Sequence, residues 1–169
     1  SIALGGKVTA GQLNIDSGDD LSITTEVDNL NVVMNGNGNL TVDQTGDLSI
    51  NNLVMQGGNL TIRATGSISI SNFTGTVGTI TLVSDSGTIT LDADAAATAA
   101  VLNAAGNVTG ILDAESYSLT SGGAIDLEDP DGVLVTSLTR LVDSEPFTFT
   151  AGEDLTLQTG MSLSALAGI

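Results

Sequence analysis

Apolar and polar positions alternate in short runs along residues 11–91 of the chain. In each run two aliphatic residues flank one polar residue, and turn-forming residues bound the run. Alternation with a period of two predicts a β-strand that is buried on one face. The flanking pairs are Leu13/Ile15, Leu21/Ile23, Leu30/Val32, Leu40/Val42, Leu48/Ile50, Leu60/Ile62, Ile68/Ile70, Ile80/Leu82 and Ile89/Leu91. This part of the chain is therefore predicted to form many short strands separated by turns.

A five-residue phrase recurs at a fixed spacing within these runs. It consists of Gly, a small polar residue, an apolar residue, Thr or Ser, and a second apolar residue. The glycines that begin it lie 20 residues apart in one series, and 20 and 21 residues apart in an interleaved series: Gly38, Gly58 and Gly78, and Gly46, Gly66 and Gly87. A fixed period in this range is typical of a solenoid.

Two all-β architectures contain many short strands, and the spacing of the strands separates them. An antiparallel β-sandwich is the alternative, since it also places a strand every 8–12 residues or so. From Leu40 onward, however, the strand spacing alternates between 8 and 12 residues and sums to 20. Coils that stack must close at equal length, so the spacing favours a parallel β-helix with coils of about 20 residues. We expect one β-solenoid domain over residues 1–169, regular over about 10–91 and less regular over 92–169.

The coil hypothesis makes three local predictions. Glycines such as Gly58 should lie at corners, where a positive φ or a close backbone approach costs glycine little. The alanine-rich stretch at residues 93–105 could form a short helix, but we favour a coil with a small interior. The middle residues of the strands should point outward in two ladders, one of Ser22, Thr41, Thr61 and Thr81 and one of Asn31, Ser49, Ser69 and Thr90.

Composition restricts the chemistry that the chain can perform. It contains no His and no Cys, which excludes the common nucleophilic triads, zinc sites and imidazole acid–base catalysis. Solenoid enzymes that cleave polysaccharides use paired carboxylates, but they bind acidic sugars with several cationic and aromatic side chains. This chain has 3 Lys and Arg residues and 2% aromatic residues. We therefore expect no enzymatic activity, and a polysaccharide-cleaving enzyme is the least favoured function.

The charge is strongly acidic, with 20 Asp and Glu residues and a formal net charge of −17. Binding to phosphate groups requires clustered cations, and Lys7, Arg63 and Arg140 are isolated in the sequence. Nucleic acid is therefore not expected as a partner. Insertion into a membrane is not expected either, because the sequence has no apolar run of about 18 residues or more.

One acidic stretch is a candidate metal site. Asp126, Glu128, Asp129 and Asp131 place four carboxylates within six positions, and carboxylate oxygens are the ligands that Ca²⁺ prefers. No register of this stretch provides both the Gly and the Glu of an EF-hand loop. No cofactor is expected to be required, and calcium is the candidate ligand. The competing interpretation is a solvated acidic turn.

Three phrases resemble the repeats of filamentous-haemagglutinin-type exoproteins, the large bacterial surface adhesins of two-partner secretion and autotransporter systems. They lie at residues 64–71 (Ala-Thr-Gly-Ser-Ile-Ser-Ile-Ser), 17–23 (Ser-Gly-Asp-Asp-Leu-Ser-Ile) and 150–157 (Thr-Ala-Gly-Glu-Asp-Leu-Thr-Leu). The resemblance implies a right-handed parallel β-helix, export, and a role at the cell surface or in the matrix. It carries over no functional residue, because the repeat itself is structural. We expect the chain to be a segment of a longer exported protein.

Several functions fit this sequence. The leading hypothesis is a non-catalytic structural or adhesive segment of a bacterial cell-surface or secreted protein, forming a stiff rod or fibre. Its partners would be other segments of the same protein or a host or matrix surface. A second hypothesis is a subunit of an extracellular filament that associates head to tail, because open solenoid ends expose unpaired backbone groups. A third is a module that binds calcium or glycans.

Overall fold

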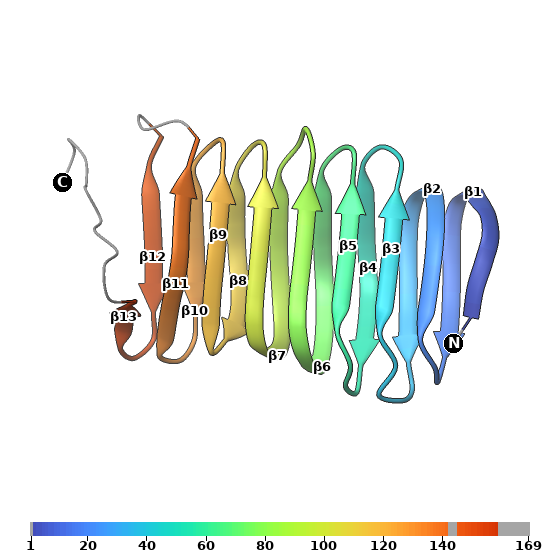
Figure 1. The fold of residues 1–169 in the computed structure, drawn as a ribbon, viewed down its shortest axis with the longest axis horizontal. Coiled ribbons are helices and arrows are strands. Elements are labelled where there is room, and N and C mark those ends of the chain that lie inside the picture. The colour runs from blue at the N-terminus through green and yellow to red at the C-terminus, as the bar shows by residue number, and fades with distance from the viewer. Residues whose placement is uncertain (1, 142–144, 159–169) are drawn as a thin grey trace.

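The chain folds as a β-solenoid of about 7 turns, in which parallel strands stack at intervals of about 20 residues. The computed structural model describes residues 2–141 and 145–158, and 74% of the chain is strand, with no helix in the described part. Strands stack side by side from the N-terminal to the C-terminal end in Figure 1. The predicted parallel solenoid is confirmed, and the β-sandwich alternative is wrong. The described residues contain no helix with the length and apolar character needed to cross a membrane.

Thirteen strands belong to a single sheet, and each pair of neighbouring strands is parallel. The strands are β1 (Ile2–Ser17), β2 (Leu21–Met34), β3 (Leu40–Gln44), β4 (Leu48–Met55), β5 (Leu60–Ala64), β6 (Ile68–Ser84), β7 (Ile89–Ala104), β8 (Val108–Ala114), β9 (Ser116–Ser121), β10 (Ile125–Asp129), β11 (Val133–Arg140), β12 (Phe147–Ala151) and β13 (Leu155–Leu157). The strands predicted at residues 147–150 and 155–157 are thereby confirmed.

The sheet wraps around the interior and forms two faces. Strands β3, β5, β9, β11 and β13 lie on the first face, and β4, β8, β10 and β12 lie on the second. The long strands β2, β6 and β7 contribute to both, since β2 pairs with β3 through residues 21–25 and with β4 through residues 29–34. Each coil therefore crosses one face, turns a corner and returns along the other (Figure 1).

The interior is a column of aliphatic side chains that stack from coil to coil. Leu40 pairs with Leu60 and Leu60 with Ile80, and all three side chains are buried. Burial of one such side chain contributes about 1.5–3 kcal/mol to folding. Because every coil places the same kind of residue at the same position, each coil covers the core of its neighbour, as expected for a repeat protein.

The outward ladders are confirmed on the first face and partly wrong on the second. Ser22, Thr41, Thr61 and Thr81 pair in register along the first face. On the second face Ser49, Ser69 and Thr90 pair as predicted, but the partner of Ser49 is Asn29 rather than Asn31. The cause is a register shift between Leu30 and Asn31, which pairs Asn31 with Asn52.

Glycine occupies positions where a side chain would meet the coil below. Gly58 has a φ of 72°, and a Cβ atom there would lie 2.3 Å from the carbonyl oxygen of Gly38. This confirms the predicted corner role of Gly58. Gly110, which the sequence pattern does not single out, has a φ of 121° and would place a Cβ atom 1.8 Å from the carbonyl oxygen of Leu91. Any other residue at either position requires the backbone to move.

The alanine-rich stretch forms part of β7, so the predicted coil is confirmed and the helical alternative is wrong. Its inward alanines pair with large residues in the two neighbouring coils. Ala93 pairs with Phe73 in the coil before, and Ala100 pairs with Tyr117 in the coil after. All four side chains are buried. The small interior of this coil therefore makes room for the two aromatic rings, and normal packing density is maintained.

Candidate functional site

The structure does not bring the four carboxylates of the predicted calcium site together. In β10 the side chains of Asp126 and Glu128 are exposed, whereas Asp129 is fully buried. Asp131 is exposed in the turn that follows the strand. The reason is the two-residue period of the strand, which continues from Ile125 and Leu127 to Asp129 and turns that carboxylate inward.

The buried carboxylate of Asp129 is held by three hydrogen bonds. Its Oδ2 accepts one from the Tyr117 hydroxyl, at 2.9 Å, and one from the Ala114 backbone N–H, also at 2.9 Å. Its Oδ1 accepts a bond of 2.9 Å from the backbone N–H of Asp131. The Tyr117 hydroxyl also donates to the carbonyl oxygen of Leu112. Buried charges persist in proteins when they are hydrogen-bonded in this way, so the arrangement joins three successive coils.

Tyr117 is placed to stabilise this region and not to exchange protons near neutral pH. Burial raises the pKa of Tyr117, and the negative charge of Asp129 raises it further. The ring of Tyr117 packs against that of Phe149 with the centroids 5.2 Å apart and an interplanar angle of 79°. Such an edge-to-face contact is favourable. The phenol therefore remains neutral and acts as a hydrogen-bond donor to the carboxylate.

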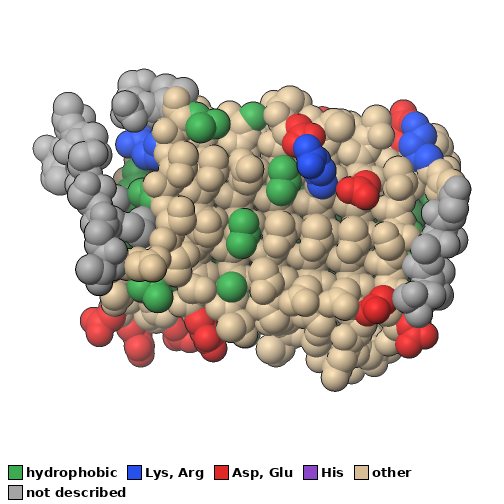
Figure 2. All heavy atoms as spheres, in the orientation of Figure 1, with side chains coloured by type: hydrophobic (Ala, Val, Ile, Leu, Met, Phe, Trp, Pro, Cys, Tyr) green, Lys and Arg blue, Asp and Glu red, His purple; other side chains and the backbone are tan. Residues whose placement is uncertain are grey.

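A second group of carboxylates lies around this network. Burial raises the pKa of Asp113, and the carboxylates of Asp129, Asp131 and Glu115 raise it further. Figure 2 shows acidic side chains gathered along the lower edge of the view, toward the C-terminal end. Even so, the described residues contain no group of three or more carboxylates arranged to hold a metal ion. Calcium binding stays a prediction, which a calorimetric titration with CaCl₂ would test.

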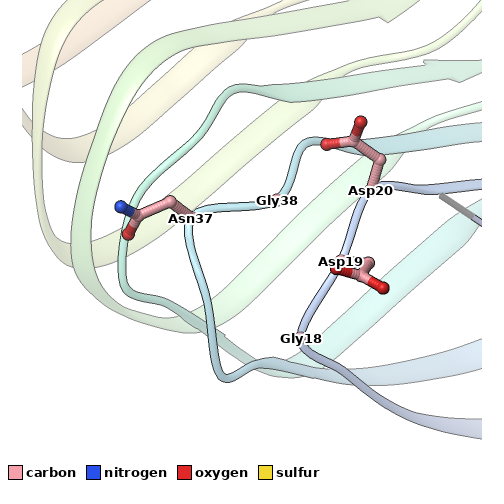
Figure 3. Close-up of a pocket in the computed structure, with 5 residues that line it drawn as sticks. All are labelled: Gly18, Asp19, Asp20, Asn37 and Gly38. Atoms are coloured by element: carbon pink, nitrogen blue, oxygen red, sulfur yellow. The ribbon is translucent and has the colours of Figure 1, made fainter.

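A polar hollow lies at the opposite end of the molecule, between the turns of the first two complete coils. Gly18, Asp19, Asp20, Asn37 and Gly38 line it, and its volume is about 310 Å³. Figure 3 shows that the hollow is formed where the turn at residues 18–20 lies beside the turn at residues 37–38. All three polar side chains are exposed, so the hollow is an open indentation between neighbouring turns.

One carboxylate of this hollow belongs to a ladder of side-chain hydrogen bonds. The Oδ1 atom of Asp20 accepts bonds from the backbone N–H and the side-chain amide of Asn39, at 2.8 and 3.0 Å. Asn39 accepts the same two bonds from Asn59, and Asn59 accepts one from the backbone N–H of Thr79. The bond from the Asn39 backbone lowers the pKa of Asp20. The ladder connects four coils along the outside of the turns.

No protein-family model, curated protein or solved structure matches this chain. The candidate sites therefore depend on geometry alone.

Sequence reasoning missed the two polar networks that the structure reveals. The inward position of Asp129 was available from the alternation of Ile125, Leu127 and Asp129. Its pairing with Tyr117 was not, because the coils at this point contain fewer than 20 residues. The amide ladder had a signal as well, since Asn39 and Asn59 occupy the same position of the repeated phrase.

Proposed function

We propose that this chain is a non-catalytic structural segment of a bacterial cell-surface or secreted protein, in which it forms a stiff rod. It would separate the parts of that protein that contact a host or matrix surface from the parts that are anchored. The phrases that resemble filamentous-haemagglutinin-type repeats support the extracellular location.

The observation that carries the proposal is the continuity of inter-coil contacts. Backbone ladders join every pair of neighbouring coils from β1 to β13 on at least one face. The aliphatic column fills the interior along the same direction, and side chains such as Asn39 and Asn59 add hydrogen bonds outside it. Three kinds of contact therefore resist bending at each junction. The polar residues named above participate mainly in these contacts, which suits a segment whose property is shape.

Deletion of one whole coil tests the structural role. Removal of residues 60–79 from the full-length gene product joins Asn59 to Ile80, which pairs with Leu60 in the intact chain. Because each coil contacts only its neighbours, the shortened protein is expected to fold and to reach the surface. Adhesion of cells that carry it should stay within about twofold of the unaltered protein. Loss of adhesion despite normal surface display would show that this coil contains a specific binding site.

Location is tested by labelling intact cells. Antibodies raised against the purified 169-residue chain should bind the surface of unpermeabilised source cells. A strain that lacks the gene provides the control for specificity. Labelling that requires permeabilisation would contradict an extracellular rod.

A further inference from the structure

The N-terminal end of the solenoid presents an unpaired strand edge. Among the described strands β1 pairs with β2 alone, so one side of its backbone has no strand beside it. The inward residues Ala10, Leu13 and Ile15 pack against the core but remain partly exposed at this end. An edge of this length with apolar residues behind it is a template for another strand.

The edge turns a corner in the middle, and its residues are matched on either side of that corner. Gly11 and Gln12 are both exposed and lie at the corner, where the alternation of inward and outward residues changes phase. Before it, Val8 and Ala10 pair with inward residues of β2; after it, Leu13 and Ile15 do so. The outward residues Lys7, Thr9, Asn14 and Asp16 are exposed.

The ten residues from Lys7 to Asp16 are therefore complementary to their own reverse. Reading inward from the two ends pairs a cation with an anion, Lys7 with Asp16. The next positions pair two apolar residues, Val8 with Ile15, and then two polar residues, Thr9 with Asn14. The last positions before the corner pair Ala10 with Leu13.

We propose that two copies of this chain associate through their β1 edges, end to end, around a two-fold axis that passes through the corner at Gly11 and Gln12. The two edges pair antiparallel, so that each Lys7 lies opposite the partner's Asp16. Inward residues meet inward residues, and the two aliphatic columns join into one. A self-complementary patch of this kind is what an isologous two-fold interface requires.

The geometry of strands agrees with this register. In an antiparallel pair, residues directly opposite each other point to the same face of the sheet. The pairs Val8 with Ile15 and Ala10 with Leu13 point inward on both copies, and Lys7 with Asp16 point outward on both. A shift of the register by one residue would place apolar residues opposite outward polar ones. The corner of each copy also stays above the corner of the other.

Charge acts both for and against the association. Two contacts between Lys7 and Asp16 favour it, since opposite charges directly across a strand pair are stabilising. The net charge of −17 on each copy opposes it at long range. At an ionic strength of about 0.15 M the screening length is about 8 Å, so the distant repulsion is weakened while the close pairs remain. The measurements below are therefore made at that ionic strength.

Charge reversal tests the proposal by sedimentation velocity over a concentration series. The unaltered chain of 16.9 kDa is expected to form a species of twice that mass. Lys7→Glu creates two repulsive contacts per dimer and is expected to abolish it, as is Asp16→Lys. The double variant Lys7→Glu/Asp16→Lys restores opposite charges and should restore the dimer. Arg63→Glu changes an exposed cation in the middle of a face and should leave association unaltered.

A disulfide tests the register independently of the charges. The chain has no Cys, so a pair of introduced cysteines gives an unambiguous product. The double variant Thr9→Cys/Asn14→Cys places each cysteine opposite its partner's, and oxidation should give a covalent dimer. The two positions lie five residues apart along one strand, beyond the Cα separation of about 4.4–6.8 Å that a disulfide within one copy needs. Thr9→Cys alone is the control and should stay monomeric.

Three results would overturn the proposal: a monomer at all concentrations, a dimer that survives both single charge reversals, or filaments longer than two copies. Filaments would indicate head-to-tail stacking instead. Circular dichroism of every variant separates loss of the dimer from loss of the fold. The proposal goes beyond the structural role and fails separately from it, because a rod that remains a monomer still fits that role.

Discussion

The coils up to Leu91 and the coils after it obey the same topology but achieve their packing differently. On the first face Leu40, Leu60, Ile80 and Ala100 pair at intervals of 20 residues. The next intervals are 17 residues to Tyr117, 18 to Val135 and 22 to Leu157. The described residues with large exposed hydrophobic side chains all lie in the later part: Val101, Ile111, Leu134, Leu141 and Leu155.

The difference shows that a solenoid can change coil length if it changes residue size as well. In the earlier coils similar aliphatic residues repeat, and the interior has a constant cross-section. In the later coils alanines in β7 lie between Phe73 and Tyr117, and the hydrogen-bonded Asp129 fills a position that an aliphatic residue would occupy in a regular coil. Packing is thus maintained by complementary sizes, which makes single positions in the later coils more critical.

Truncation of Tyr117 should have the largest effect on the stability of the later coils. Tyr117→Ala removes a buried ring and the donor to Asp129, and is expected to lower the free energy of unfolding by about 3–5 kcal/mol. Tyr117→Phe keeps the ring and should cost about 1–3 kcal/mol, because one hydrogen bond to the buried carboxylate is lost. Urea denaturation measures both. Equal losses for the two variants would mean that the hydroxyl, and not the ring, carries the effect.

In the regular coils the most sensitive position should be a corner and not a core residue. Gly58→Val is expected to cost more than about 2 kcal/mol, because a left-handed backbone alone costs a non-glycine residue about 1–2 kcal/mol and the new side chain also meets the Gly38 carbonyl. Thr61→Val, on the outward ladder of the same coil, is the matched control and should shift the melting temperature by much less. Similar melting shifts for the two variants would contradict the corner role.

Enlarging the alanine coil tests whether its small interior is required. Ala95 is fully buried and pairs with Gly75. Ala95→Leu is expected to cost about 1–3 kcal/mol through overpacking, whereas Leu60→Met, a volume-conserving change in a regular coil, should cost less than about 1.5 kcal/mol. Thermal unfolding followed by circular dichroism compares them. A stabilising effect of Ala95→Leu would reveal unfilled space between the neighbouring aromatic rings.

The acidic group of the later coils should give the smallest effect, visible as a dependence on pH. The pKa of Asp113 is raised in the folded state by burial and by the nearby carboxylates, so the folded protein binds this proton before the unfolded chain does. Its contribution to stability therefore increases as the pH falls from neutral through the raised pKa, and levels off below the ordinary value of 3.8.

The variant Asp113→Asn isolates that contribution. It is expected to melt at a slightly higher temperature than the unaltered chain at pH 7, because the repulsion is absent. The gap between the two should close as the pH is lowered. A gap that stays constant with pH would assign the effect to packing and not to charge.

The sequence predicts the regular coils well because the same constraint is repeated at each of them. The alternation around Leu40, Leu60 and Ile80 specifies which side faces the core, and the 20-residue period specifies which strands are neighbours. The register shift at Asn31 could not be predicted, since it depends on how a bulge is accommodated between two coils. The network of Asp129 and Tyr117 could not be predicted either, because it joins coils of unequal length.

The ladder of Asp20, Asn39 and Asn59 has a direction, and this makes it vulnerable to chemical ageing. An amide both donates and accepts, so Asn39 and Asn59 can each donate to the preceding coil and accept from the following one, while the carboxylate of Asp20 accepts only. The row therefore begins at an acid and ends at the backbone N–H of Thr79. Hydrolysis of either amide to a carboxylate would remove a donor from the middle of the row. Two oxygens would then face each other, and the outer connection between those turns would be lost while the aliphatic column remained intact.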